Sequence, residues 1–205
     1  MRLRLTPLAI ALIILFAGAS QPQLAMTNQN RENPDFRVQV WGYIVADFTT
    51  RVWDYFELRS ELELGLPPLT ITDDPAEIRR AIRCLAKRIR VWRAEAKQGD
   101  IFTPTITVEF RKALIVEMSP NTWAAIMDDN PGEFSTRING TYPGDKPLST
   151  MPPNILAALP RLPDDIEYRF VGRHLILLDT RANLIVDRIP YAIQSPGGVG
   201  LTCHR

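Results

Sequence analysis

Residues 167–189 read EYRFVGRHLILLDTRANLIVDRI and decide the fold. They contain three short runs rich in β-branched, aromatic and aliphatic residues, which are Glu167–Val171, His174–Asp179 and Leu184–Ile189. Short polar segments separate the runs, and these segments contain Gly172 and Asn183. Both residue types accept the positive φ angles that tight turns require. The stretch therefore predicts a three-stranded antiparallel meander.

Helical periodicity dominates the chain before this stretch. Apolar residues recur at three- and four-residue steps over about 34–63, and a second helix is predicted over about 75–97. The second helix has an apolar seam with a 4-3-4-3 spacing, which we interpret as core: Ile78, Ile82, Leu85, Ile89 and Trp92. Shorter helices are predicted from about 105 to 118 and from Pro120 onward.

A connector rich in proline and glycine joins the helices to the strands. It spans residues 131–163, and we expect it to run irregularly over the surface with one short helix at 154–159. A three-stranded sheet needs a cover for its apolar face, and the helices are the expected one. The predicted fold is α+β, with an N-terminal helical hairpin or bundle (about 34–128), the connector and a C-terminal meander. Residues 34–193 form one domain, and 194–205 are predicted to be a flexible tail.

The first residues have the three parts of an export signal. Arg2 and Arg4 are the charged start, residues 8–16 are an uninterrupted apolar run, and Ala17-Gly18-Ala19 supplies a small-x-small cleavage site. We therefore predict a signal peptide over residues 1–19 and an exported protein, either periplasmic or secreted.

Two alternatives to this processing remain open. A second possible cut follows Ala25, and residues 20–33 are predicted to be a flexible lead-in. The other alternative is an uncleaved anchor to the inner membrane formed by residues 5–19. This segment is shorter than the roughly 20 apolar residues that span a bilayer, which favours cleavage.

The composition excludes several classes of function. The 24 basic and 23 acidic residues give a net charge of +1, so no overall electrostatic attraction to nucleic acid is expected. Two cysteines exclude a Cys-rich zinc module, and no C-x-x-C or H-E-x-x-H motif occurs. We therefore expect no metal site and no cofactor. Cys84 and Cys203 would meet an oxidising compartment, but their positions favour two free thiols over a disulfide.

The predicted helix over 75–97 is strongly basic. Eight basic residues lie between Pro75 and Gln98 against two acidic ones, whereas residues 31–74 hold nine acidic and four basic residues. Two adjacent helices of opposite sign would neutralise one another in an antiparallel hairpin, and this interpretation is favoured. If the basic helix has a partner, we expect an anionic surface or an envelope protein, contacted through Arg79, Arg83, Lys87 and Arg90.

Candidate catalytic residues are few. Asp47, Asp54 and Glu57 share one helical region, but no spacing rule selects them as paired carboxylates. No G-x-S-x-G motif occurs, and His174 and Asp179 are separated along one predicted strand. We therefore predict a non-enzymatic exported binding or interaction protein. The alternatives are a hydrolase-type enzyme with helix-borne carboxylates and a membrane-anchored envelope protein.

Two segments carry a resemblance to known proteins. They are GLPPLTITDDPAEIRRAIRCLAKRIRVWRAEAKQGDIFTP (65–104) and LPDDIEYRFVGRHLILLDTRANLIVDRIPYAI (162–193). They resemble an uncharacterised family of short exported bacterial proteins with no assigned function, over most of residues 60–193. The pattern LP-x4-YR-x-VG-x2-L-x-L-x-D is similar to the C-terminal hairpin of periplasmic nickel and cobalt homeostasis proteins. The resemblance implies export and a bacterial source, but no activity and no ligand residues.

Overall fold

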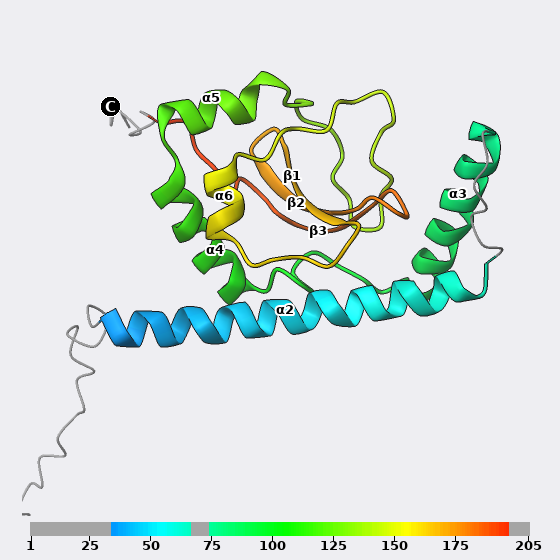
Figure 1. Ribbon diagram of the computed structural model, residues 1–205, viewed down its shortest axis with the longest axis horizontal. Coiled ribbons are helices and arrows are strands. Elements are labelled where there is room, and N and C mark those ends of the chain that lie inside the picture. Colours follow the sequence, from blue (N-terminus) through cyan, green and yellow to red (C-terminus); the bar gives the residue numbers. More distant parts are fainter. Residues whose placement is uncertain (1–33, 67–73, 197–205) are drawn as a thin grey trace, which may run out of the picture. The chain divides into compact units, whose positions relative to one another are not determined.

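The computed structural model describes residues 34–66 and 74–196 (Figure 1). The chain divides into two units, 1–37 and 38–205, and only the first turn of one helix is described in the first unit. The predicted signal peptide, lead-in and Cys203 lie outside the described residues. Within the described ranges, no helix is both long enough and apolar enough to span a bilayer.

Helices precede a small sheet, as the sequence predicts. The helices are α2 (Pro34–Leu64), α3 (Pro75–Trp92), α4 (Pro104–Glu117), α5 (Pro120–Asp128) and α6 (Pro153–Ala158). The strands are β1 (Ile166–Val171), β2 (His174–Asp179) and β3 (Leu184–Ile189), which form one antiparallel sheet in the order β1-β2-β3. The predicted α+β fold with a C-terminal meander is confirmed.

Local sequence signals set the element boundaries. Proline opens α3, α4 and α5, where its missing N–H removes no helical hydrogen bond. The side chains before these prolines, Asp74, Thr103 and Ser119, each accept a hydrogen bond from a backbone N–H of the first turn. Gly172 and Asn183 have φ angles of 57° and 51°, which confirms the turns predicted at both positions.

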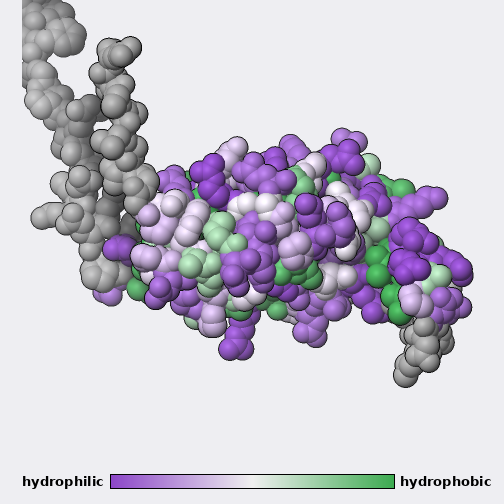
Figure 2. Space-filling model, turned by 90° about the horizontal axis from the view of Figure 1, so that it is seen from above, coloured by the Kyte–Doolittle hydropathy of each residue, from purple (hydrophilic) through white to green (hydrophobic). Residues whose placement is uncertain are grey.

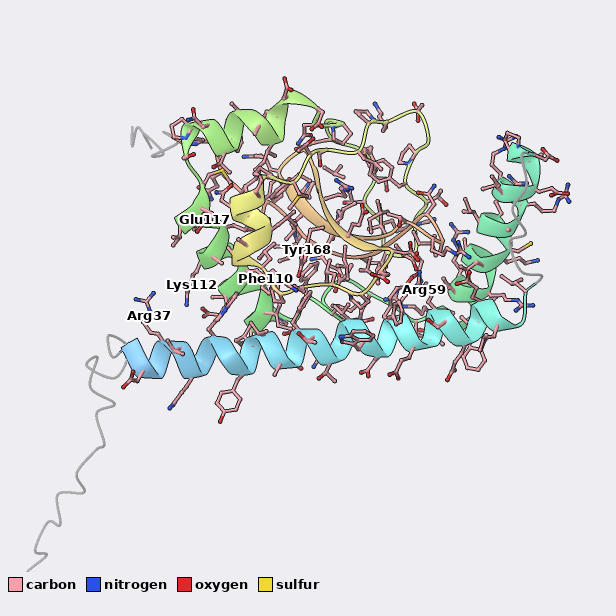
Figure 3. The ribbon with its side chains drawn as sticks, viewed as in Figure 1. Arg37, Arg59, Phe110, Lys112, Glu117 and Tyr168 are labelled. Atoms are coloured by element: carbon pink, nitrogen blue, oxygen red, sulfur yellow. The ribbon has the colours of Figure 1, made fainter. Side chains whose placement is uncertain are left out.

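One face of the sheet packs against the helices. Phe48 of α2 and Phe110 of α4 are fully buried, with ring centroids 4.8 Å apart. Tyr168 of β1 lies 6.3 Å from Phe110, between the sheet and α4 (Figure 3). Tilted aromatic contacts of this kind stabilise a core beyond the area they bury. The helices therefore cover this face of the sheet, as the sequence predicts.

The connector covers the opposite face, which the sequence did not predict. Tyr142 and Phe134 of the connector pack against Ile176 and Leu178 of β2 and Ile185 of β3. The two connector rings meet edge to face, with centroids 5.1 Å apart. The proline-rich segment is therefore a second layer of the core rather than a surface loop.

The packing of α3 differs from the expected antiparallel hairpin. Figure 1 shows α3 standing at a steep angle to the end of α2. The two helices are joined through Arg88, which donates hydrogen bonds to the carbonyls of Leu62 and Gly65 at 2.9 and 2.7 Å. Glu63 of α2 pairs with Arg181 of the β2–β3 turn instead of with α3. The opposite charges of these helices therefore do not cancel along a shared face.

The expectation that Trp92 belongs to the core is wrong. Leu85 and Ile89 of the same seam are buried, but Trp92 is 70% exposed. Helix α3 ends at Trp92, and the chain turns away before Gly99, which has a φ angle of 93°. The seam is not buried beyond Ile89, and its first residue, Ile78, is also exposed, at 39%.

A bulge in β3 reverses the direction of one carboxylate. The pairing of β2 with β3 shifts register between Leu177 and Leu178, so that Asp187 points toward the helical layer. Asp187 is fully buried and accepts hydrogen bonds from the backbone N–H groups of Gly99, Ile101 and Phe102 at 2.8 to 3.0 Å. The side chain therefore fixes the whole segment between α3 and α4.

We expect Asp187→Ala to lower the free energy of unfolding by about 3 kcal/mol or more, because buried N–H groups lose their acceptor. Asp187→Asn keeps one carbonyl oxygen and loses less. Asp100→Ala is the matched control, since among the described residues Asp100 accepts from the Lys97 N–H alone, and the expected loss is about 1 kcal/mol. Urea unfolding measures all three, and equal losses in Asp187→Ala and Asp100→Ala would contradict this role.

Candidate functional site

The four basic residues predicted to meet an anionic partner lie on one face of α3. Their spacing of four, four and three residues places Arg79, Arg83, Lys87 and Arg90 in one stripe along the helix. The first three are exposed, and Arg90 is half-buried. None of them takes part in the ion pairs found in the described part of the chain. Figure 2 shows hydrophilic residues over the end of the molecule where α3 lies.

The stripe leads into a pocket of about 680 Å³, which we call the basic pocket. Its walls come from α3, the segment after α3, connector residues 134–139 and β3. Four cationic side chains line it, and no lining residue is acidic: Arg90, Lys97, Arg137 and Arg188. Sequence analysis missed Arg137 and Arg188, because they lie on the connector and on a strand far from the basic helix. Clustered like charges on a concave surface raise the local potential and attract counter-ions.

Asn139 holds the connector wall of the basic pocket against α3. Its backbone oxygen accepts from Arg90 Nε at 2.9 Å, and its side-chain oxygen accepts from Arg93 Nη1 at 3.1 Å. Its amide nitrogen donates to the Arg93 carbonyl at 2.7 Å. The residue has a φ angle of 58°, which asparagine tolerates better than most side chains. Arg90 is therefore oriented by neutral acceptors rather than by a carboxylate.

Arg188 is oriented in the same way from the other wall. It donates from Nη1 to Thr136 Oγ1 at 2.6 Å and from Nε to Gln98 Oε1 at 3.0 Å. Lys97 and Arg137 are exposed at the rim. The pocket thus combines two fixed cations with two that are free to adjust. Its lining contains no His, Cys, Asp or Glu, so it supplies hydrogen-bond donors and positive charge for an anion but no acid–base pair.

No family model, no curated protein and no solved structure matches this chain. The family resemblance drawn from residues 65–104 and 162–193 stays a prediction.

The helix-borne carboxylates do not converge on a pocket. Asp47, Asp54 and Glu57 are all exposed on α2, and Asp47 pairs with Arg51 one turn along the same helix at 2.9 Å. None of the three lines the basic pocket or the apolar pocket described below. An exposed pair within one helix contributes a few tenths of a kcal/mol to stability.

Two further polar side chains, Asp129 and His174, make structural contacts. Asp129 accepts from the backbone N–H and the hydroxyl of Thr150, and these hydrogen bonds lower its pKa. His174 Nδ1 accepts from the Tyr191 N–H, and burial lowers the pKa of its imidazole. His174 and Asp179 occupy opposite ends of β2 and form no dyad. Within the described ranges, no group of three or more His, Cys, Asp or Glu side chains is placed to hold a metal ion.

A buried polar cluster joins α2 to the β2–β3 turn. Tyr55 donates to Asp179 at 2.6 Å, and Asp179 also accepts from the Ala182 N–H at 2.8 Å. The Arg59 guanidinium reaches from α2 toward the same carboxylate, with an N–O distance of 3.8 Å (Figure 3). Burial raises the pKa of Asp179, and burial together with the neighbouring carboxylate raises that of Tyr55. No pocket described for this chain reaches the cluster, so its role is to position α2.

We expect the contribution of Asp179 to stability to fall as pH rises. A carboxyl whose folded pKa is raised binds its proton more tightly in the folded state, so stability is lost between about pH 4 and that raised pKa. The difference in unfolding free energy between the native chain and Asp179→Asn should therefore shrink with increasing pH across this window and then become constant. Urea unfolding from about pH 4 to about pH 8 measures it. Asp145→Asn, at an exposed carboxylate, is the control for the substitution itself, and a difference that grows with pH for Asp179 would contradict this role.

Proposed function

We propose that this chain is a non-enzymatic exported binding protein whose basic surface attaches it to an anionic surface of the cell envelope. The observation that carries the proposal is the basic pocket, where cations from α3, the segment after it, the connector and β3 surround one hollow without an acidic side chain. Arg90 belongs both to this pocket and to the stripe on α3, so the two form one continuous basic surface.

The accessibility of α3 supports this function. The first ten residues of the helix contain no buried side chain, and burial begins only at Leu85. A helix that served only the core would bury its apolar seam along its whole length. Here the seam anchors the second half, and the first half presents Arg79 and Arg83 to solvent. Basic residues close to an anionic membrane contribute about 1 kcal/mol each to attachment.

Vesicle binding tests the proposal on the full exported chain. We expect binding to phosphatidylglycerol vesicles and none to phosphatidylcholine vesicles, and the binding should weaken with salt because the contacts are exposed. Replacing two rim cations, as in Lys97→Gln with Arg137→Gln, should lower the affinity about thirtyfold, since two contributions of about 1 kcal/mol are lost. Cosedimentation over a range of lipid concentrations measures this change.

The matched control is Lys146→Gln with Arg161→Gln, which removes two exposed cations that do not line the basic pocket. It changes the net charge by the same amount and should leave vesicle affinity within about twofold, because distant surface charges are screened. Equal losses in both double variants would mean that net charge alone drives binding. The same result would overturn the basic pocket as the site. Absence of binding to anionic vesicles at low salt would overturn the anionic surface as the partner.

A further inference from the structure

A second pocket lies between α4 and the segment that follows β3. Its volume is about 540 Å³, within the range of small-molecule sites, and it shares no lining residue with the basic pocket. We call it the apolar pocket, because most of its lining side chains are apolar: Leu114, Ile115, Met118, Tyr191, Ala192, Ile193 and Pro196. Leu114 and Ile193 are buried and form its floor, whereas Ile115 is 70% exposed at the rim.

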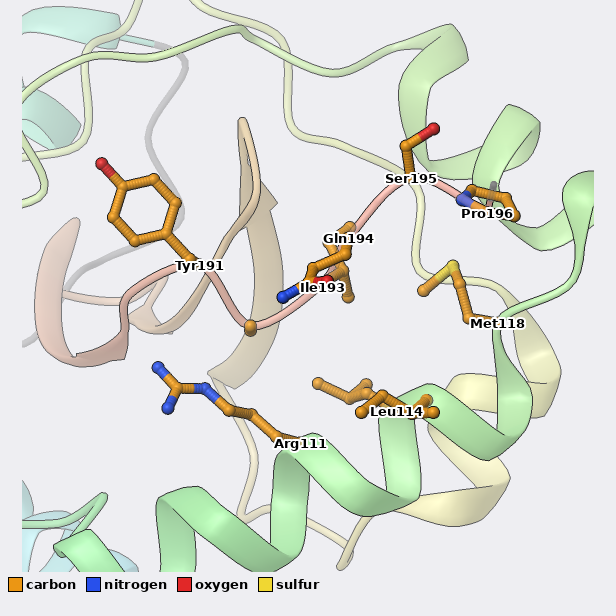
Figure 4. Close-up of a pocket in the computed structure, with 10 residues that line it drawn as sticks. Arg111, Leu114, Met118, Tyr191, Ile193, Gln194, Ser195 and Pro196 are labelled. Carbon is orange, nitrogen blue, oxygen red and sulfur yellow. The ribbon is translucent and has the colours of Figure 1, made fainter. Parts of the chain in front are cut away.

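One charged side chain lines this pocket. Figure 4 shows the Arg111 guanidinium extending from α4 toward Tyr191 and Ile193, with Leu114 further along the helix and Met118 directly after its end. Arg111 Nη2 donates to the Pro190 carbonyl at 2.6 Å, which fixes the position of the group. Its Nε is buried and has no acceptor among the described residues. No ion pair in the described ranges involves Arg111.

The Arg111 guanidinium is therefore only partly paired within the described residues. A guanidinium has five N–H donors, and among the described residues one protein acceptor, the Pro190 carbonyl, is found for Arg111. A partly desolvated charge with unmatched donors gains more from an anion than a fully hydrated surface cation does. The surrounding apolar wall excludes strongly hydrated partners and favours a ligand that brings one negative charge on an apolar body.

We propose that the apolar pocket binds a small amphipathic monocarboxylate, such as a medium-chain fatty acid. The carboxylate lies against the Arg111 guanidinium, and the alkyl chain lies against Leu114, Met118 and Ile193. This assignment does not rest on the basic pocket, which is polar and has four cations where this pocket has one.

Calorimetric titration of the full chain with three ligands of equal chain length tests the proposal. We expect decanoate to bind, and decanol and decylammonium to bind at least about tenfold more weakly, because they lose the charged hydrogen bond to Arg111. Decanol binding as tightly as decanoate would overturn the proposal, since burial of the alkyl chain alone would then explain the affinity. Absence of decanoate binding below its micellar concentration would overturn it as well.

Variants at the pocket locate the carboxylate. Arg111→Gln should weaken decanoate at least about tenfold and leave decanol unchanged. Because Arg111 also holds the Pro190 carbonyl, a second test uses the exposed rim residue Ile115. Ile115→Glu should weaken decanoate, whereas Ile115→Lys should retain or strengthen it. Equal affinities in these two variants would overturn the placement of the carboxylate beside Arg111.

Val116→Glu is the matched control for the rim variant. Val116 is 81% exposed on the same helix and does not line the apolar pocket, yet the substitution adds the same charge. Its effect on decanoate should be smaller than that of Ile115→Glu, because solvent and salt screen a charge directed away from the pocket. An equal or larger effect would mean that decanoate binds on the outer face of α4.

Discussion

Burial of β2 on both faces is the constraint on which the rest of the structure depends. All five residues from Leu175 to Asp179 are buried, so a three-stranded sheet has to be enclosed from two sides. The helices enclose one side. On the other side, within the described ranges, the proline-rich connector supplies Tyr142 and Phe134 as the second layer. The bulge in β3 then turns Asp187 toward the helical side, where it satisfies the backbone N–H groups between α3 and α4.

This enclosure also brings the basic pocket together. A connector packed on the outer face of the sheet must pass beside the end of α3, where Asn139 binds both Arg90 and Arg93. The same path places Arg137 and the strand residue Arg188 around one hollow. Arg90 and Arg188 donate hydrogen bonds to neutral oxygen atoms, so these contacts do not offset the positive charge of the pocket. The site is thus a consequence of how the sheet is covered.

The sequence predicted the elements because their signals are local. Turn residues such as Gly172 and Asn183, and the prolines that begin α3 to α5, act within a few residues. The helical spacing of apolar residues does not show which of them meet a packing partner. The same spacing therefore predicts Trp92 in the core, although burial along α3 ends one turn earlier, at Ile89. The stripe on α3 was identified from helical spacing. Arg137 and Arg188 carry no pattern of their own, and only the path of the connector brings them beside that stripe.

The two pockets show why net charge is a poor guide to what a protein binds. A total of +1 conceals both a cluster of four cations and a single arginine in apolar surroundings. The role proposed for the cluster depends on long-range attraction, which salt weakens and which does not distinguish between anions. Arg111 acts at contact distance in a partly dry site, where geometry and desolvation decide the affinity. Selectivity between ligands is therefore expected of the single arginine more than of the cluster, because a half-buried charge in apolar surroundings disfavours both a neutral head group and a strongly hydrated tail.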